Sequence, residues 1–191
     1  MASGIGCVII RAMNTVGQRL GFWLFLLSGG FWVHGFDPQT DGMQGIKDLV
    51  RKRFPEVSQL QTAELAEWLS DTNRPKPVLL DVREVEEFEV SHLAGAKNVN
   101  PDAKVGDIKA MIATNRPVVV YCSVGYRSSA LARRLAKGGL TNVFNLEGSI
   151  FQWANEGRPL VKSEPAEPAE KVHPYNKRYG VLLKPALRAE D

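Results

Sequence analysis

One cysteine in this sequence has the neighbours that a reactive thiol requires. Cys122 comes directly after the strand-forming run VVVY, and Arg127 follows it after four intervening residues. The next segment, SSALARRLAK, has the apolar spacing of a helix, so the thiol lies between the end of a strand and the start of a helix. A helix N-terminus and a nearby cation both lower the pKa of a thiol, and the thiolate is the nucleophilic form. We therefore predict that Cys122 is an ionised nucleophile.

The turn that follows Cys122 is predicted to bind an anion. Its residues, together with the first helical positions, are Ser123, Val124, Gly125, Tyr126, Arg127 and Ser128. A turn this short must curl tightly and point successive backbone N–H groups inward, and Gly125 permits the sharp bend. Such a concave surface favours negative charge, first on the thiolate and then on a bound oxyanion. The alternative is a small buried hydrophobic cysteine with a surface arginine, but a cation at a helix start is unfavourable unless it faces a ligand.

The composition of the chain is that of a folded protein of ordinary size. Of its 191 residues, 44% are hydrophobic and 24% are charged, which predicts one packed domain with extensions. The net charge is only +3, and no dense Lys/Arg block with interleaved aromatic residues occurs, so nucleic acid is not expected as a partner. The two cysteines, Cys7 and Cys122, form neither a disulfide framework nor a metal-ligand spacing.

The first 36 residues have the composition of a targeting or anchoring segment. They contain no acidic side chain, and Arg11 and Arg19 precede a stretch at residues 20–36 that lacks Asp, Glu, Lys and Arg. This order predicts a signal peptide or a membrane-anchor segment for residues 1–36, with membrane association through residues 20–36. The alternatives are a buried hydrophobic helix or a mitochondrial-type presequence. We accordingly expect an exported, periplasmic-type or membrane-anchored protein rather than a cytoplasmic one.

The rest of the sequence alternates predicted helices and strands. Residues 37–56 contain an amphipathic lead-in helix, which Pro55 stops. A brief extended piece, VSQLQ, follows, and the strand-forming segments VLLDV, KNVN, VVVYC and NVFNL are then separated by helical segments. Apolar strands without polar alternation, each followed by a helix, predict an α/β fold with a parallel sheet that helices cover on both faces.

The composition changes at about residue 162, where the main domain is predicted to end. Residues 163–172 are rich in Pro, Ala and Glu and predict an extended linker. Residues 173–191 regain aromatic and aliphatic side chains, including Tyr175 and Tyr179, so this C-terminal extension is expected to dock against a surface that the sequence does not identify. The main domain therefore occupies residues 57–162.

Three stretches within this main domain resemble the rhodanese, or sulfurtransferase, family. The segment LLDVREVEEFEVSHLAGAKNVN resembles the first signature of the family, YCSVGYRSS resembles its active loop, and VFNLEGSIFQWANEGRPLV resembles its closing signature. The order and the separation of the three motifs make the resemblance specific. It implies a three-layer rhodanese-like fold, in which a central five-stranded parallel sheet has helices on both faces.

The resemblance also implies persulfide chemistry at Cys122. A donor such as thiosulfate would pass its outer sulfur to the thiolate, and a thiophilic acceptor, cyanide or a thiol, would then remove it, in two covalent steps. The implied partners are a small sulfur-containing anion and a thiol acceptor, with the loop amides and Arg127 binding the donor, and no metal or organic cofactor is implied. Arg127 is the only charged residue of the loop, whereas efficient thiosulfate enzymes of the family carry additional basic residues.

Four residues of the first signature are predicted to support the site, namely Asp81, Arg83, Glu87 and His92. In one interpretation they contact the substrate or support the loop from behind. In the other, which we favour, they form an ion-pair and hydrogen-bond network that fixes the turns between strands and helices. His92 has no evident partner for general-base catalysis, and an ionised thiol needs no base. Trp153 of the closing signature is assigned to the core.

Two other functions compete with sulfur transfer. Cysteine phosphatases and arsenate reductases also place a Cys and an Arg around an amide-lined loop, but with one residue more than the four that separate Cys122 from Arg127. The shorter loop makes a smaller cradle, which suits a sulfur atom better than a tetrahedral phosphoryl group. The second competitor is a non-catalytic rhodanese-like domain that binds a partner or senses an anion, and the intact Cys122 argues against it.

Overall fold

The fold was obtained as a computed structural model that describes residues 37–112, 116–162 and 165–190. The strands of the main sheet are β1 Ser58–Leu60, β2 Val78–Asp81, β3 Lys97–Asn98, β4 Val118–Tyr121 and β5 Val143–Leu146. A hairpin outside this sheet consists of β6 Leu160–Lys162 and β7 Glu167–Ala169. The α-helices are α1 Met43–Arg53, α2 Thr62–Ser70, α3 Val85–Val90, α4 Val105–Ile112, α5 Tyr126–Lys137, α6 Ser149–Asn155 and α7 Lys177–Gly180.

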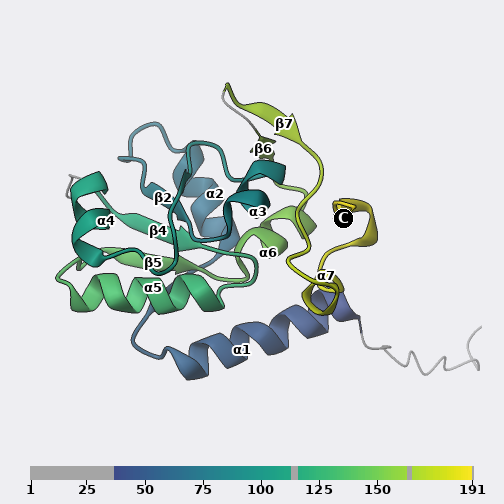
Figure 1. The fold of residues 1–191 in the computed structure, drawn as a ribbon, viewed down its shortest axis with the longest axis horizontal. Helices are drawn as coiled ribbons and strands as arrows, with labels where there is room; N and C mark the ends of the chain where they lie inside the picture. The colour runs from purple at the N-terminus through teal and green to yellow at the C-terminus, as the bar shows by residue number, and fades with distance from the viewer. Residues whose placement is uncertain (1–36, 113–115, 163–164, 191) are drawn as a thin grey trace, which may run out of the picture. The chain divides into compact units, whose positions relative to one another are not determined.

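The main sheet is parallel throughout, with the strand order β1-β5-β4-β2-β3 (Figure 1). β4 is the central strand, and its last residue, Tyr121, pairs in register with Asp81 at the end of β2. The residues after both strands therefore lie at the same edge of the sheet, which is where ligands bind in open α/β sheets. The predicted α/β class and the predicted sheet of parallel strands are confirmed.

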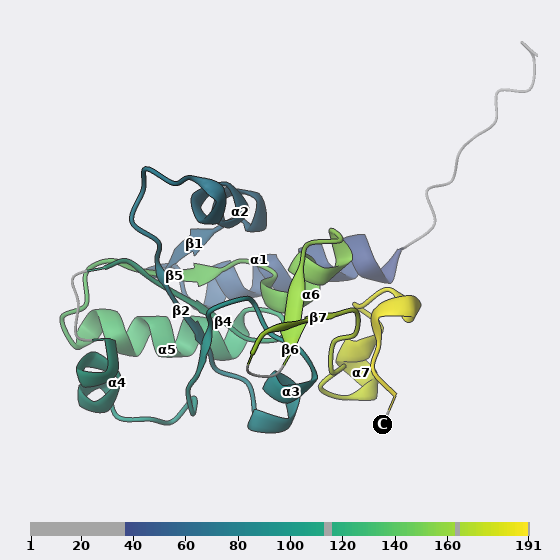
Figure 2. The same cartoon turned by 90° about the horizontal axis from the view of Figure 1, so that it is seen from above.

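Helices cover both faces of the sheet, as predicted, and each face has its own core (Figures 1 and 2). Leu79 and Val119 pack with residues of α2 and α6 on one face. Their neighbours Leu80 and Val120 point to the other face, because side chains alternate along a strand, and pack with residues of α4 and α5. Each fully buried aliphatic side chain stabilises the fold by about 1.5–3 kcal/mol, so the strands that carry the candidate loop are firmly held.

The lead-in helix α1 packs Met43 and Val50 into the cores on the two faces and forms an ion pair beside the sheet. It ends at Arg53, before Pro55, as the proline predicts. Arg51 of α1 forms an ion pair with Glu147, which is buried directly after β5, and Nη2 of Arg51 donates to Oε2 of Glu147 at 2.9 Å. Gln61 also donates to this carboxylate. The glutamate of the closing signature thus joins the lead-in helix to the main domain.

The segment that the sequence predicts as a linker contains a strand. β7 pairs antiparallel with β6, and Val161 of β6 also bridges to His92, so this part of residues 163–172 is a hairpin arm rather than a bare spacer. The pairing left no signal in the sequence, because Pro and Glu are poor strand formers and the short strand depends on its partner. After the hairpin, the C-terminal segment, residues 172–190, lies beside α6 (Figures 1 and 2) and contributes Val172, Leu182 and Leu183 to the core.

The predicted signal peptide or membrane anchor, residues 1–36, lies outside the described residues. Within the ranges that the structure does describe, no helix is long and apolar enough to cross a membrane.

Candidate functional site

Cys122 lies immediately beyond the C-terminal end of β4, at the edge of the sheet. Its backbone N–H donates to the Ser149 hydroxyl at the start of α6 (3.2 Å), and its carbonyl accepts from the Ile150 N–H (3.1 Å). These bonds connect the loop after β4 to the loop after β5. The thiol is only 1% exposed, although its side chain borders a pocket. Its position is therefore fixed from both neighbouring loops, and it can react only through that pocket.

The turn after Cys122 curls as the sequence predicts. Gly125 has a φ of +105°, in the left-handed region, and an added Cβ would lie 3.3 Å from Nδ2 of Asn145. This bend points the N–H of Gly125 back at Cys122, where it donates to Sγ at 3.1 Å. The Ser128 hydroxyl lies 3.5 Å from the same sulfur. Only glycine avoids strain at this φ, and the conformation places donors around the sulfur.

Arg127 is held at the pocket by two acceptors on different elements. Its guanidinium makes a fork with Glu87 of α3, with Nη1 to Oε2 at 2.9 Å and Nη2 to Oε1 at 3.0 Å. Nη2 also donates to the Ser123 hydroxyl at 2.9 Å, and that hydroxyl donates to Glu87 at 2.9 Å. A closed triangle of side chains therefore links α3 to both ends of the loop.

These contacts lower the pKa of the Cys122 thiol. Burial raises the pKa, because it disfavours the charged form. The positive charge of Arg127 and the hydrogen bonds from Ser128 and Gly125 act in the opposite direction and prevail, so the pKa lies below its ordinary value. For Glu87, burial likewise raises the pKa, and Arg127 and Ser123 lower it further than burial raises it. The loop thus favours a thiolate beside an ionised Arg127–Glu87 pair.

The reactivity of Cys122 should therefore titrate at lower pH than that of an ordinary thiol. Deprotonation creates the charged, reactive form, so a lowered pKa gives more thiolate at any given pH. The rate of alkylation by iodoacetamide, followed by intact mass, is expected to rise with pH through a midpoint below about 8.5, the usual value for cysteine. Arg127→Gln should move the midpoint to higher pH, because it removes the nearby positive charge.

A second arginine of α5 provides the matched control for this titration. Arg133 has the same side chain, but it contacts Glu56 and the ring of Phe54 instead of the loop. Arg133→Gln should leave the midpoint unchanged. Equal midpoints for the wild type and Arg127→Gln would show that the guanidinium does not set the pKa of Cys122.

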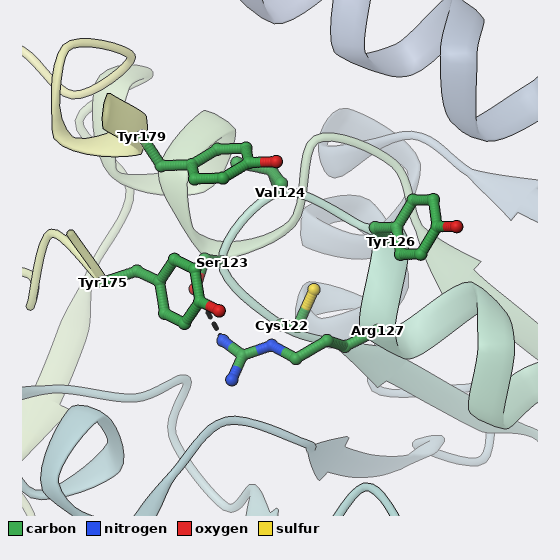
Figure 3. A pocket seen from close by; sticks show the side chains of 7 residues that line it. All are labelled: Cys122, Ser123, Val124, Tyr126, Arg127, Tyr175 and Tyr179. Atoms are coloured by element: carbon green, nitrogen blue, oxygen red, sulfur yellow. Dashed lines mark hydrogen bonds between the residues drawn. The ribbon is translucent and has the colours of Figure 1, made fainter. Parts of the chain in front are cut away.

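The pocket at Cys122 has a volume of about 130 Å³ and contains two residues that the sequence did not assign to it. The loop residues that line it are Cys122, Ser123, Val124, Tyr126 and Arg127. The other two lining residues, Tyr175 and Tyr179, belong to the C-terminal segment, and their rings face the loop (Figure 3). The sequence signal for these two residues was the return of aromatic and aliphatic side chains after the Pro-rich segment, which predicted a docked extension. Nothing in the sequence indicated which surface they would contact.

None of the four predicted supporting residues lines this pocket, although Glu87 is joined to it through Arg127. Asp81 and Arg83 are buried and bound to each other, with Nη2 of Arg83 to Oδ2 of Asp81 at 2.6 Å. The same Nη2 donates to the Ser91 carbonyl at 2.6 Å, which fixes the turn after α3. His92 stacks on the ring of Phe88 at 3.8 Å, and its Nδ1 lies 3.0 Å from the carbonyl of that residue. Asp81, Arg83 and His92 thus make ion-pair, hydrogen-bond and stacking contacts within the fold and not in the pocket.

A polar connection behind the sulfur was also missed from the sequence. Ser128 donates to Oδ1 of Asn145 at 2.6 Å, and Nδ2 of Asn145 donates to Gln59 at 2.7 Å. Asn145 is fully buried in β5, between apolar neighbours. An amide in the middle of a buried strand needs hydrogen-bond partners, and this requirement was the available signal. The connection runs from the helix that carries the loop to the edge strand β1.

Comparison with known proteins identifies the family. Residues 62–156 match the rhodanese-like domain family. The uncharacterized protein YqhL of Bacillus subtilis (strain 168) is 40% identical over 81 residues, which are 42% of this chain and 64% of YqhL. The thiosulfate sulfurtransferase GlpE of Actinobacillus succinogenes is 34% identical over 83 residues, 44% of this chain and 74% of GlpE. A solved thiosulfate sulfurtransferase from Pseudomonas aeruginosa superposes with a TM-score of 0.54 at 23% identity, covering 63% of this chain and 23% of that one.

The chain belongs to the rhodanese-like family. The match to GlpE shows the family, and the likeness to the Pseudomonas aeruginosa structure shows the fold. The matched region spans less than two thirds of YqhL and about a quarter of the Pseudomonas aeruginosa chain. The family match ends at residue 156, so Tyr175 and Tyr179 lie beyond it.

Proposed function

We propose that this protein is a sulfurtransferase that carries a sulfane sulfur on Cys122 as a persulfide. The observation that carries the proposal is the environment of Sγ, which borders an open pocket, accepts the Gly125 N–H at 3.1 Å and has a lowered pKa beside Arg127. A thiolate in this position is a nucleophile that a small sulfur compound can reach. The sulfurtransferase relatives support the same assignment.

The reaction consists of two displacements at sulfur. In the first, the Cys122 thiolate attacks the outer sulfur of a donor such as thiosulfate, an S–S bond forms to Sγ, and sulfite leaves with the electron pair of the broken S–S bond. In the second, cyanide or a thiolate acceptor attacks the terminal sulfur of the persulfide, and Sγ leaves as the thiolate. No external oxidant or reductant is needed, and the enzyme returns to its starting state.

The loop supplies what an anionic persulfide requires. The first turn of α5 carries backbone N–H groups that have no acceptor within the helix, and they begin at the loop. We expect these groups, with the N–H of Gly125, to stabilise the negative charge that moves onto the terminal sulfur. Arg127 contributes its charge, whereas its two terminal nitrogens stay with Glu87 and Ser123 and hold the loop in shape.

The proposal predicts thiocyanate formation from a sulfane donor and cyanide. Because the donor product leaves before the acceptor reacts, varying both substrates should give the parallel double-reciprocal lines of ping-pong kinetics. The same preparation should release phosphate from phosphotyrosine far more slowly. Phosphate release as fast as thiocyanate formation would favour the phosphatase alternative. Failure to form thiocyanate with any sulfane donor would favour the non-catalytic alternative.

A further inference from the structure

We propose that Tyr175 and Tyr179 of the C-terminal segment determine the specificity of the sulfur pocket, and that they select organic sulfane donors, thiosulfonates or persulfides with an apolar or aromatic group, over inorganic thiosulfate. The inference rests on the proposed function, since it names the substrate class for the same site. It is carried by residues outside the matched family region, which ends at residue 156.

The C-terminal segment is anchored on both sides of the tyrosine pair. Before the pair, Val172 is fully buried and exchanges backbone hydrogen bonds with Leu187 (2.7 Å) and Ala189 (3.0 Å). After it, Leu183 is fully buried, and the Leu182 carbonyl accepts from Nδ2 of Asn155, on α6, at 2.7 Å. These anchors place the segment between them beside the loop, so the two rings form one wall of the pocket.

The backbone between these anchors is bent so that the rings face the loop. Tyr175 has a φ of +64°, which side chains rarely adopt and which persists only where the surroundings enforce it. Its N–H donates to Nδ1 of His173 at 3.0 Å, and the Tyr179 N–H donates to Oδ1 of Asn176 at 3.0 Å. The two tyrosine rings meet edge to face at 5.8 Å. The strained position therefore directs an aromatic pair at the pocket.

Tyr175 also contacts the cation of the site. The guanidinium carbon of Arg127 lies 4.7 Å from the centroid of the Tyr175 ring (Figure 3). One side of the guanidinium is thus covered by an aromatic ring, while its terminal nitrogens bind Glu87 and Ser123. A donor in the pocket would therefore contact the aromatic ring as well as the cation.

The charge of the pocket argues against a small dianion as the preferred donor. Arg127 is the only cationic residue among the lining residues, and its charge is already paired with Glu87. A dianion would bring two negative charges next to the Cys122 thiolate. The one cation in the pocket lining, Arg127, already has its charge balanced by Glu87. An organic donor carries less charge and gains contact with the aromatic and aliphatic lining, Tyr126, Tyr175, Tyr179 and Val124.

Benzenethiosulfonate is a suitable probe for this preference. The Cys122 thiolate would attack its terminal sulfur, an S–S bond would form to Sγ, and benzenesulfinate would leave with the electron pair of the broken S–S bond. The enzyme product is the same persulfide that thiosulfate gives, so cyanide discharges both as thiocyanate. The two donors therefore differ only in the group that occupies the pocket.

The test compares kcat/KM for the two donors in the full chain, with cyanide as the acceptor. The wild type should prefer benzenethiosulfonate, and the Tyr175→Ala/Tyr179→Ala variant should lower the ratio of the two kcat/KM values about tenfold, as expected for the loss of aromatic contacts. The Tyr175→Phe/Tyr179→Phe variant keeps the rings and should restore the ratio. Val181→Ala, an exposed residue of the same segment outside the pocket lining, should leave the ratio unchanged.

An unchanged ratio in the alanine pair, or a wild type that prefers thiosulfate, would overturn the inference while leaving sulfur transfer in place. Absence of thiocyanate from both donors would instead overturn the proposed function, and this inference with it. If the alanine pair melts well below the wild type, Tyr175→Leu replaces it, because leucine keeps the bulk and removes the aromatic face. The ratio must then fall with that variant.

Discussion

Replacing Cys122 with serine is expected to abolish sulfur transfer. A serine hydroxyl stays protonated at neutral pH and cannot form a persulfide, so neither displacement at sulfur can take place. We expect the rate of thiocyanate formation to fall by at least about a thousandfold, as it does when the nucleophile of a covalent mechanism is removed. The measurement is the initial rate with thiosulfate or benzenethiosulfonate as the donor and cyanide as the acceptor.

The serine variant should remain folded, because Cys122 and serine are similar in size and the loop keeps its other contacts. Thermal unfolding of the variant and of the wild type provides this control. Thiocyanate formation at more than a few per cent of the wild-type rate, in a correctly folded Cys122→Ser protein, would show that another group carries the sulfur.

The largest loss of stability is expected from Asp81→Ala. This change leaves the guanidinium of Arg83 buried without its carboxylate, and removing one partner of a buried ion pair costs about 3–5 kcal/mol. In a domain of this size, 1 kcal/mol shifts the melting temperature by about 2–4 °C, so the variant should melt at least about 6 °C below the wild type. Thermal unfolding followed by circular dichroism measures the shift.

An exposed pair provides the comparison for Asp81. Asp48 lies 3.7 Å from Arg51 on the surface of α1, and Asp48→Ala should change the free energy of unfolding by less than about 0.5 kcal/mol. The double variant Asp81→Leu/Arg83→Met should unfold at a higher temperature than Asp81→Ala, because it removes both charges. A double variant that is less stable than Asp81→Ala would contradict the assignment of the cost to an unpaired charge.

The parts of the fold that could be predicted from sequence are those with local causes. The strand-forming run VVVY predicted β4, Gly125 predicted a sharp bend in the turn, which the structure shows to be left-handed, and the helical spacing predicted α5. Consecutive elements in an α/β fold pack next to one another, so a strand, a turn and a helix read in order also predicted where Cys122 would lie. For the same reason the loop residues were identified without knowledge of the rest of the chain.

The features that could not be predicted depend on contacts between distant parts of the sequence. Glu87 and Arg127 lie 40 residues apart, and no local pattern indicated that they form a fork. Asn145 of β5 accepts a hydrogen bond from Ser128 of α5, and Tyr175 contacts Arg127 from beyond a Pro-rich segment. Side-chain pairing of this kind follows from tertiary packing alone. The polar network and the aromatic wall therefore required the structure.

The central claim is that Cys122 takes up and releases one sulfur atom, and intact-mass measurement tests it most directly. After incubation with thiosulfate or benzenethiosulfonate and removal of the excess, the full chain should gain the mass of a single sulfur atom. Cyanide should remove the gain, and Cys122→Ala should never show it. An unmodified mass with both donors, or the same gain in Cys122→Ala, would contradict the account.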